Sequence, residues 1–144
     1  MKIIVDTNIV FSAVLNTNSK IADILFNSDG KLLFYSPTFL RVEIEEHKEK
    51  LQQLSGYSDV VLAETIFQIF ETIQFISDEQ IPFEIWKRSI PIVREVDMDD
   101  LVFIALADYM NAFLWTGDKI LYKGAKAKGF ENILTTNELI EFRK

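Results

Sequence analysis

The sequence predicts an α/β fold with a parallel central sheet, and three observations support this prediction. Short apolar runs typical of buried strands alternate with helical patterns along all 144 residues, as in chains built from β-α-β units. Carboxylates follow closely after two of the predicted strands, at Asp6 and Asp118. No internal repeat, low-complexity stretch or linker divides the chain, so we expect one domain over residues 1–144.

The first elements are predicted from apolar runs and from residues that begin helices. Residues 2–5 form an apolar strand, and a helix over 7–15 starts directly from its end. Ser19 is a typical N-cap for a helix over 20–28. The apolar run 31–35 then predicts the second strand.

The middle of the chain reads as two helices and a strand. We expect one long helix over 36–54 with Pro37 in its first turn, where proline is favoured. Ser58 caps a helix over 59–72, and residues 73–76 form the third strand. The side chains that share one face of the long helix are Leu40, Ile44, His47 and Leu51.

The last part of the chain repeats the alternation. Pro82 starts a helix that Pro91 ends or kinks. A helix from Asp99 or Asp100 to Met110 is apolar on nearly all sides, which is typical of a buried helix. The remaining expected elements are a strand over 113–116, a helix over 119–128, a strand over 132–134, and a helix from Thr136 to about Phe142.

The composition excludes several classes of site. The chain has no cysteine, which rules out disulfides and thiolate metal sites, and its one histidine, His47, argues against a zinc site or a His-dependent triad. The stretch before Asp6 is too short for a signal-peptide core, and no apolar run reaches the roughly 18 residues of a membrane span. We therefore expect a cytoplasmic protein without a membrane association.

The net charge of −7 is unusual for a nucleic-acid-binding protein, which ordinarily presents a basic face. Acids gathered at a metal site, or a basic partner protein, would each account for this charge. A local phosphate-binding track is still compatible with it, because basic residues cluster in two places. These are Lys119, Lys123, Lys126 and Lys128 after Asp118, and Arg41, Lys48 and Lys50 on the long predicted helix.

The placement of the acids predicts a metal site. Ligands of an open parallel sheet bind beyond the carboxyl ends of its strands, so Asp6 and Asp118 are expected to meet there. Asp97, Asp99 and Asp100 precede a helix that must run back to the sheet. Carboxylates crowded in one small volume repel each other unless a hard cation holds them. We therefore expect a Mg²⁺ or Mn²⁺ site, and phosphodiester chemistry is the commonest use of one.

Each acid also has a purely structural interpretation. Asp6, Asp100 and Asp118 stand where helix N-caps are expected, and acids in a first turn complement the helix dipole. Glu43 is one of four glutamates on the long predicted helix, an arrangement typical of a solvated face. The residues by themselves therefore do not select Glu43 over its neighbours.

Four segments in order, VDTNI, SPTFLRVEI, DMDDLVFIALA and WTGDKIL, resemble those of PIN-domain nucleases, including the VapC-type toxin ribonucleases. The resemblance extends from Lys2 to about Leu139. It implies a three-layer α/β/α sandwich around a parallel sheet of four to five strands.

The resemblance also implies a set of site residues. The catalytic acids would be Asp6, Glu43, Asp100 and Asp118, of which Asp6, Asp100 and Asp118 would hold the Mg²⁺ or Mn²⁺ ion. The spacing to the following helix favours Asp100 for the third acid. The other implied residues are Asn8 and Thr116 as polar neighbours of the metal and Asp97 as an alternative or further ligand.

The resemblance implies a metal-dependent endoribonuclease in which metal-activated water hydrolyses the phosphodiester. Many small members of the family are toxins of toxin–antitoxin pairs, and a basic antitoxin would fit the net charge. We also expect a homodimer. Lys119 and Lys123 share one helix face that starts at the expected site, so we expect them, with Arg41, to contact RNA phosphates.

Three alternatives stay open. A PIN nuclease of RNA maturation or decay would have the same site without an antitoxin. A phosphotransferase or receiver domain would use an aspartyl nucleophile at the first strand, but Asn8 stands where its second acid is needed. A catalytically inactive PIN-like binding module is the third alternative, although all four acids are present.

Overall fold

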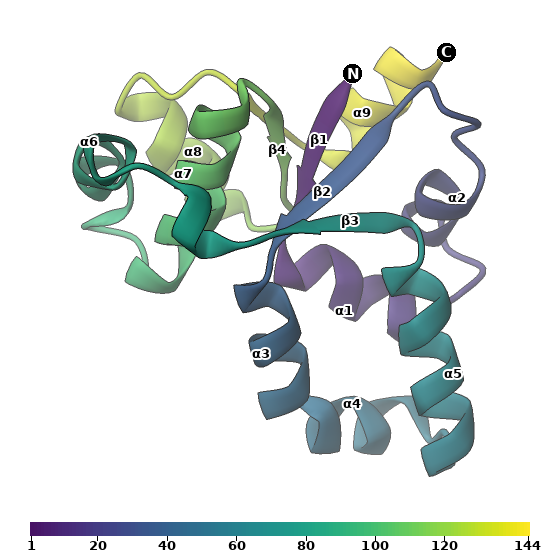
Figure 1. The fold of residues 1–144 in the computed structure, drawn as a ribbon. Helices are drawn as coiled ribbons and strands as arrows, with labels where there is room; N and C mark the ends of the chain where they lie inside the picture. The colour runs from purple at the N-terminus through teal and green to yellow at the C-terminus, as the bar shows by residue number, and fades with distance from the viewer.

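The computed structural model describes residues 1–144 and contains one parallel five-stranded sheet with helices on both sides (Figure 1). The strand order is β3-β2-β1-β4-β5, which confirms the predicted α/β class and parallel sheet. The strands are β1 (Lys2–Val5), β2 (Leu33–Pro37), β3 (Ile73–Ile76), β4 (Phe113–Trp115) and β5 (Ile133–Leu134).

The helices form two layers around this sheet. Figure 1 shows α6 (Phe83–Val93), α7 (Leu101–Met110) and α8 (Lys119–Ala127) on one side, with α7 directly against β1, β2 and β4. On the other side lie α1 (Thr7–Leu15), α2 (Lys20–Phe26) and α5 (Asp59–Phe70). The remaining elements are α3 (Phe39–Glu46), α4 (Lys48–Ser55), α9 (Thr136–Arg143) and the 3₁₀ turns η1 (Asp78–Gln80) and η2 (Met98–Asp100).

One apolar core fills the space between the layers. The run Val102–Ala107 of α7 is buried throughout, as its all-round apolar pattern predicts. Many phenylalanines, by contrast, are not core residues. Phe67 and Phe83, for example, are 63% and 76% exposed. No single helix is long and apolar enough to cross a membrane, and the one helix pair that passes by length and composition, α1 with α2, is bent by 106°.

The strand order creates a switch point beside β1. The chain passes from β1 outward to β2 and β3, and then returns across the sheet to β4 on the other side of β1. In such sheets the crevice for a ligand opens at the carboxyl ends of the two strands that flank the switch point. The register pairs Val5 with Trp115, so Asp6 and Thr116 follow side by side at this edge.

The second strand lies two residues later than predicted. It ends at Pro37, so proline closes the strand and does not open the next helix. Ser36 is buried in the strand, where its hydroxyl donates to the Val5 carbonyl oxygen at 2.8 Å. The N-terminus of α3 is instead met by Asp78 of η1, whose carboxylate accepts from the Phe39 N–H at 3.4 Å. The two residues are 39 positions apart, so the sequence around α3 gives no sign of this cap.

The long helix predicted over 36–54 is wrong, because the chain forms two helices with a break at His47 (φ −102°, ψ 12°). A straight helix of that length would be roughly 28 Å long and would leave the sheet. The break turns α4 toward α5 (Figure 1), and Leu51 becomes fully buried as α4 packs against α1. The gain from burying a leucine, roughly 1.5–3 kcal/mol, favours the turn.

Several helix ends also differ from prediction. The helices α2 and α5 end at Phe26 and Phe70, each two residues early. Pro91 does not end α6, which continues to Val93, a fully buried residue. The predicted start of α9 at Thr136 is confirmed, and Thr135 before it forms a capping box with Glu138. The spacing of threonine and glutamate three residues apart is the sequence signature of this motif.

Candidate functional site

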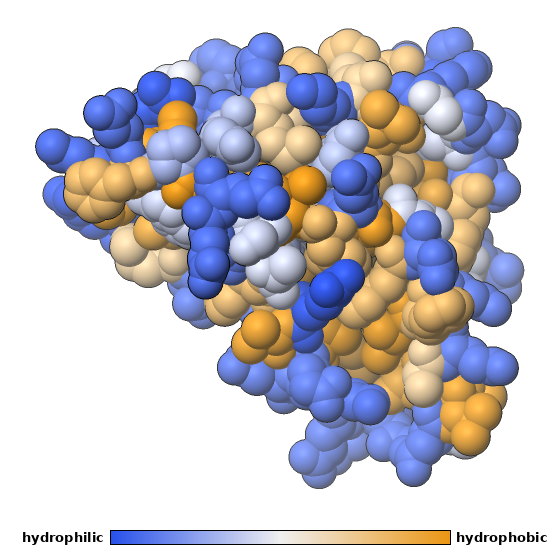
Figure 2. Space-filling view, in the orientation of Figure 1, coloured by the Kyte–Doolittle hydropathy of each residue, from blue (hydrophilic) through white to orange (hydrophobic).

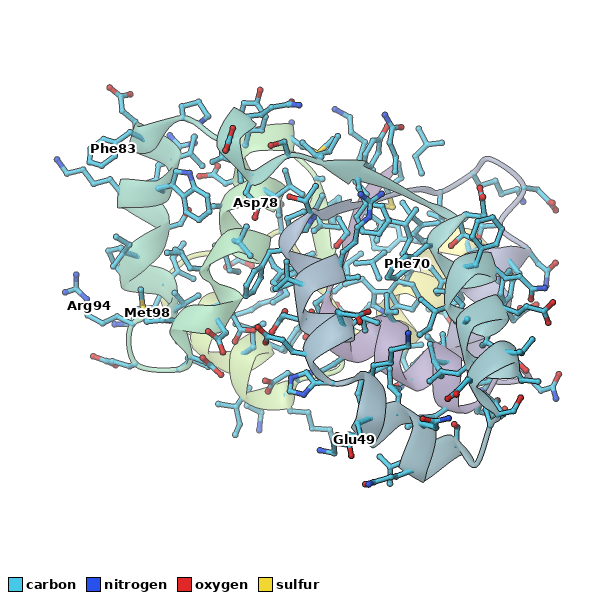
Figure 3. The ribbon with its side chains drawn as sticks, turned by 60° about the horizontal axis from the view of Figure 1, so that its bottom comes forward. Glu49, Phe70, Asp78, Phe83, Arg94 and Met98 are labelled. Atoms are coloured by element: carbon cyan, nitrogen blue, oxygen red, sulfur yellow. The ribbon has the colours of Figure 1, made fainter.

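The acids predicted from the sequence line one cavity of about 310 Å³ at the carboxyl edge of the sheet. In Figure 3 carboxylate oxygens lie between the turn marked by Met98 and the helix marked by Glu49. The lining residues come from four segments of the chain: Asp6, Thr7, Asn8, Phe11, Glu43, His47, Lys50, Asp97, Asp99, Asp100, Phe103 and Asp118.

Asp6 connects β1 to α1 and is only 4% exposed. Its Oδ1 accepts the Ile9 N–H at 3.0 Å, so the predicted N-cap role is present. The pKa of Asp6 is raised to about 6, chiefly by burial and further by the charges of Asp118 and Glu43. Hydrogen bonds from Thr116 and Ile9 lower this pKa but do not outweigh burial. Burial and the neighbouring acids thus make the ionised form of Asp6 unfavourable, and a helix cap alone does not explain why a carboxylate stands here.

Asp118 begins α8 in the same way. Its Oδ1 accepts the N–H groups of Ile120 and Leu121 at 2.9 and 3.1 Å. The buried Thr116 hydroxyl accepts the Asp118 N–H at 3.0 Å and thereby fixes the turn. Both capping bonds use one carboxylate oxygen, which leaves Oδ2 without a capping role.

Asp100 differs from these two acids because it makes no capping hydrogen bond. The cap that its position predicts is therefore absent, and Asp97 caps the preceding turn by accepting the Asp99 N–H at 2.9 Å. Burial raises the pKa of Asp100 to about 7, and the nearby charges, of which Asp97 and Asp6 contribute most, raise this pKa further. Asp100 thus presents a half-buried carboxylate that lacks a capping partner.

Glu43 is the only glutamate of α3 that lines the cavity. It accepts a hydrogen bond of 2.5 Å from the Thr7 hydroxyl, whereas Glu45 and Glu46 are exposed. Burial raises the pKa of Glu43, and the negative charge of Asp99 raises it further. The hydrogen bond from Thr7 lowers this pKa in part. The tertiary structure therefore selects Glu43, which the residue pattern does not.

Two residues that can carry positive charge also line the cavity and were not predicted there. His47 is exposed at the break between α3 and α4, not on an apolar helix face as expected, and Lys50 lies one turn later. They follow Glu43 at spacings of four and seven residues, which would repeat one face of the unbroken helix that the sequence predicts. That spacing is the signal that would have found them.

The residues predicted to contact RNA lie in two different places. Lys119 and Lys123 line a second cavity, which also borders Asp118. Arg41 lies outside both cavities, with its guanidinium 4.0 Å from the centre of the Phe75 ring, in a hollow between α3 and α5. Apolar side chains gather at the surface in this region (Figure 2).

A PIN domain model matches residues 4–138 of the chain. This match covers nearly the whole sheet and every acid of the cavity. The chain belongs to the PIN domain family. Among curated proteins, none matches the sequence.

Solved structures similar to this PIN domain share its fold at low sequence identity. PAE2754 from Pyrobaculum aerophilum is 12% identical with a TM-score of 0.69, over 99% of this chain and 89% of that one. A chain of VapBC2 from Rickettsia felis, bound to a DNA fragment from its promoter, is 13% identical with a TM-score of 0.66, over 94% and 97%. A chain of a toxin–antitoxin complex from Klebsiella pneumoniae is 16% identical with a TM-score of 0.61, over 92% and 96%.

The chemistry of the cavity fits a Mg²⁺ ion. Its acids supply carboxylate oxygens, the ligands that Mg²⁺ prefers. Burial and the charges of neighbouring acids raise the pKa values of Asp6 and Asp100, and a bound cation would offset both effects. No three acids or histidines are arranged to hold an ion among themselves. Mg²⁺ needs fewer than three protein ligands, because it keeps several bound waters and is usually held by one or two carboxylates.

A pair of substitutions at Asp118 separates its capping role from a metal role. Asn caps helices as well as Asp, so Asp118→Asn should leave thermal stability within about 0.5 kcal/mol of wild type, whereas Asp118→Ala should lose about 0.5–2 kcal/mol. Both variants should lose Mg²⁺ binding, measured by calorimetric titration. Retained Mg²⁺ binding in Asp118→Asn would restrict Asp118 to the cap.

Proposed function

We propose that this PIN domain is a Mg²⁺- or Mn²⁺-dependent endoribonuclease that hydrolyses phosphodiester bonds in cytoplasmic RNA. The observation that carries the proposal is the convergence of Asp6, Glu43, Asp100 and Asp118 from four separate elements into one cavity. At such low sequence identity, the similarity to the solved structures supports the fold alone. The proposed chemistry therefore rests on these four side chains.

The proposed reaction uses positioned carboxylates and needs no side-chain nucleophile. Asp6 and Asp118 are oriented by their capping hydrogen bonds, and Thr7 orients Glu43. Asp6, Asp100 and Asp118 are the proposed ligands, of which one or two would bind the ion directly and the rest through its waters, with Asp97 as a further candidate. Asn8 in the same cavity and Thr116, which follows β4 beside Asp6, would be polar neighbours. A bound Mg²⁺ supplies activation of water and stabilisation of the charge that develops on phosphate.

We further propose that this nuclease is the toxin of a toxin–antitoxin pair and forms a homodimer. One similar solved structure, from Klebsiella pneumoniae, is a toxin–antitoxin complex, and another is VapBC2 from Rickettsia felis bound to promoter DNA. The net charge of −7 and the acidic cavity favour a basic partner segment. A short reading frame for a DNA-binding protein next to the gene would support the pairing, and its absence would favour a role in RNA maturation or decay.

The nuclease proposal is tested with a labelled single-stranded RNA. We expect cleavage by the wild type with Mg²⁺ or Mn²⁺ and none with EDTA. Glu43→Gln should reduce the rate at least about tenfold. Glu45→Gln is the matched control, because it makes the same change on an exposed position of the same helix and should cleave like wild type. Equal rates in the two variants would remove Glu43 from the site.

A further inference from the structure

A second cavity of about 230 Å³ adjoins the acidic one, and Asp118 lines both. Its walls come from the turn after β4, the first turns of α8 and the start of α9. The volume is below the roughly 300–1,000 Å³ of pockets for drug-sized ligands, so the cavity can take only one small unit of a larger ligand.

Unpaired positive charge gathers at this second cavity. Lys119 and Lys123 both line it, and neither forms an ion pair. The next lysines of the segment each have an acid nearby, since Lys126 lies 3.6 Å from a Glu131 oxygen and Lys128 lies 3.7 Å from a Glu95 oxygen. An anionic ligand would therefore meet its strongest attraction beside Asp118 and not farther along the segment.

The cavity also has an aromatic wall. Tyr122 lines it and is partly buried in the first turns of α8. The carboxylate of Glu138 raises the pKa of Tyr122, and Glu138 is itself held by the Thr135 N–H at 3.1 Å in the capping box of α9. The Lys126 ammonium lies 5.3 Å from the centre of the Tyr122 ring. A partly buried ring has fewer orientations to lose than an exposed one, which lowers the entropic cost of stacking against it.

Free hydrogen-bonding groups complete the cavity. The Thr136 hydroxyl accepts the Trp115 indole N–H at 3.0 Å, and its own proton remains available to a ligand. Asn137 lines the cavity, is exposed, and makes no side-chain hydrogen bond within the protein. Its amide can both donate to and accept from the edge of a base.

We propose that the second cavity binds the nucleotide next to the scissile phosphodiester of a single-stranded RNA. Lys119 and Lys123 contact its phosphate, Tyr122 stacks on its base, and Asn137 contacts the base edge. Only an unpaired nucleotide can place its base in such a cavity, because a base in a helix is stacked and its pairing edge is occupied. This inference rests on the proposed ribonuclease function.

The phosphate interaction is tested by measuring the affinity of a fluorescein-labelled ten-nucleotide RNA, with Ca²⁺ in place of Mg²⁺ to slow cleavage. Lys119→Ala with Lys123→Ala should weaken binding about tenfold. For each phosphate that is no longer neutralised by a lysine, the slope of log affinity against log salt should become shallower by about 0.7. Lys31→Ala with Lys128→Ala removes the same charge from exposed positions that line neither cavity, and it should change both quantities much less. Equal effects of the two pairs would overturn the assignment.

The base interaction is tested with a second matched pair. Tyr122→Phe keeps the ring and should bind RNA within about twofold of wild type, whereas Tyr122→Leu should lose roughly 5- to 100-fold, as for one stacked base. Asn137→Ala should change the relative affinities for oligouridylate, oligoadenylate and oligocytidylate. Equal affinities in both tyrosine variants and unchanged base preference would overturn this part of the proposal.

The two proposals fail in different ways. If the wild type cleaves RNA but every variant of the second cavity binds like its control, only the nucleotide cavity is wrong. If no metal supports cleavage but the lysine and tyrosine variants still lose affinity as expected, the nuclease proposal is wrong and the RNA-binding cavity stands.

Discussion

Replacing Asp100 with asparagine should abolish RNA cleavage and leave the protein at least as stable as the wild type. The loss of activity should exceed about 100-fold, because the change removes a proposed ligand of the catalytic ion. Stability should not fall, because the Asp100 carboxylate caps no helix and is repelled by Asp97, Asp6, Asp118 and Glu43. The amide has nearly the same shape and carries no charge.

The measurement is a cleavage rate with Mg²⁺ together with a thermal melt of the metal-free protein. Asp29→Asn is the matched control, since Asp29 is an exposed aspartate away from the acidic cavity, and asparagine tolerates its positive φ of 48°. A melting temperature several degrees below wild type in Asp100→Asn would instead assign Asp100 a structural role.

Mg²⁺ should raise the melting temperature of the wild type substantially. At a concentration 100 times its dissociation constant, a ligand of the folded state alone adds about 2.7 kcal/mol, or roughly 5–10 °C for a chain of this size. Asp6→Asn should lose most of this increase while keeping the helix cap. An equal increase in both proteins would place the ion elsewhere.

The stabilisation by Mg²⁺ should also grow with pH. In the metal-free protein the pKa values of Asp6 and Asp100 are raised to about 6 and about 7 from 3.8, so the folded state binds these protons more tightly than the unfolded state. Their contribution to stability is therefore present at low pH and is lost as the pH rises through these values. Thermal melts at about pH 5 and about pH 8 should show the larger effect of Mg²⁺ at the higher pH.

The strands and most helices could be predicted because their signals are local. Apolar runs mark β1 and β4, Ser19 and Ser58 cap the helices that follow them, and the all-round apolar pattern of α7 marks it as buried. The errors occur where distant contacts override the local pattern. Asp78 replaces a local cap at α3, and the burial of Leu51 under α1 breaks the long helix at His47.

The candidate site divides in the same way. Asp6 and Asp118 follow parallel strands on either side of the switch point, so the sequence alone determined that they share one edge of the sheet. The residue pattern did not distinguish Glu43 from the other glutamates of its helix, and only the resemblance to PIN-domain nucleases favoured Glu43 and Asp100. The tertiary structure supplied the physical difference, since Glu43 accepts from Thr7 and Asp100 caps nothing, whereas Asp97 caps a turn. It also assembled the second cavity from α8 and α9, because strand ends are encoded locally whereas burial and cavities depend on segments that meet only in the folded chain.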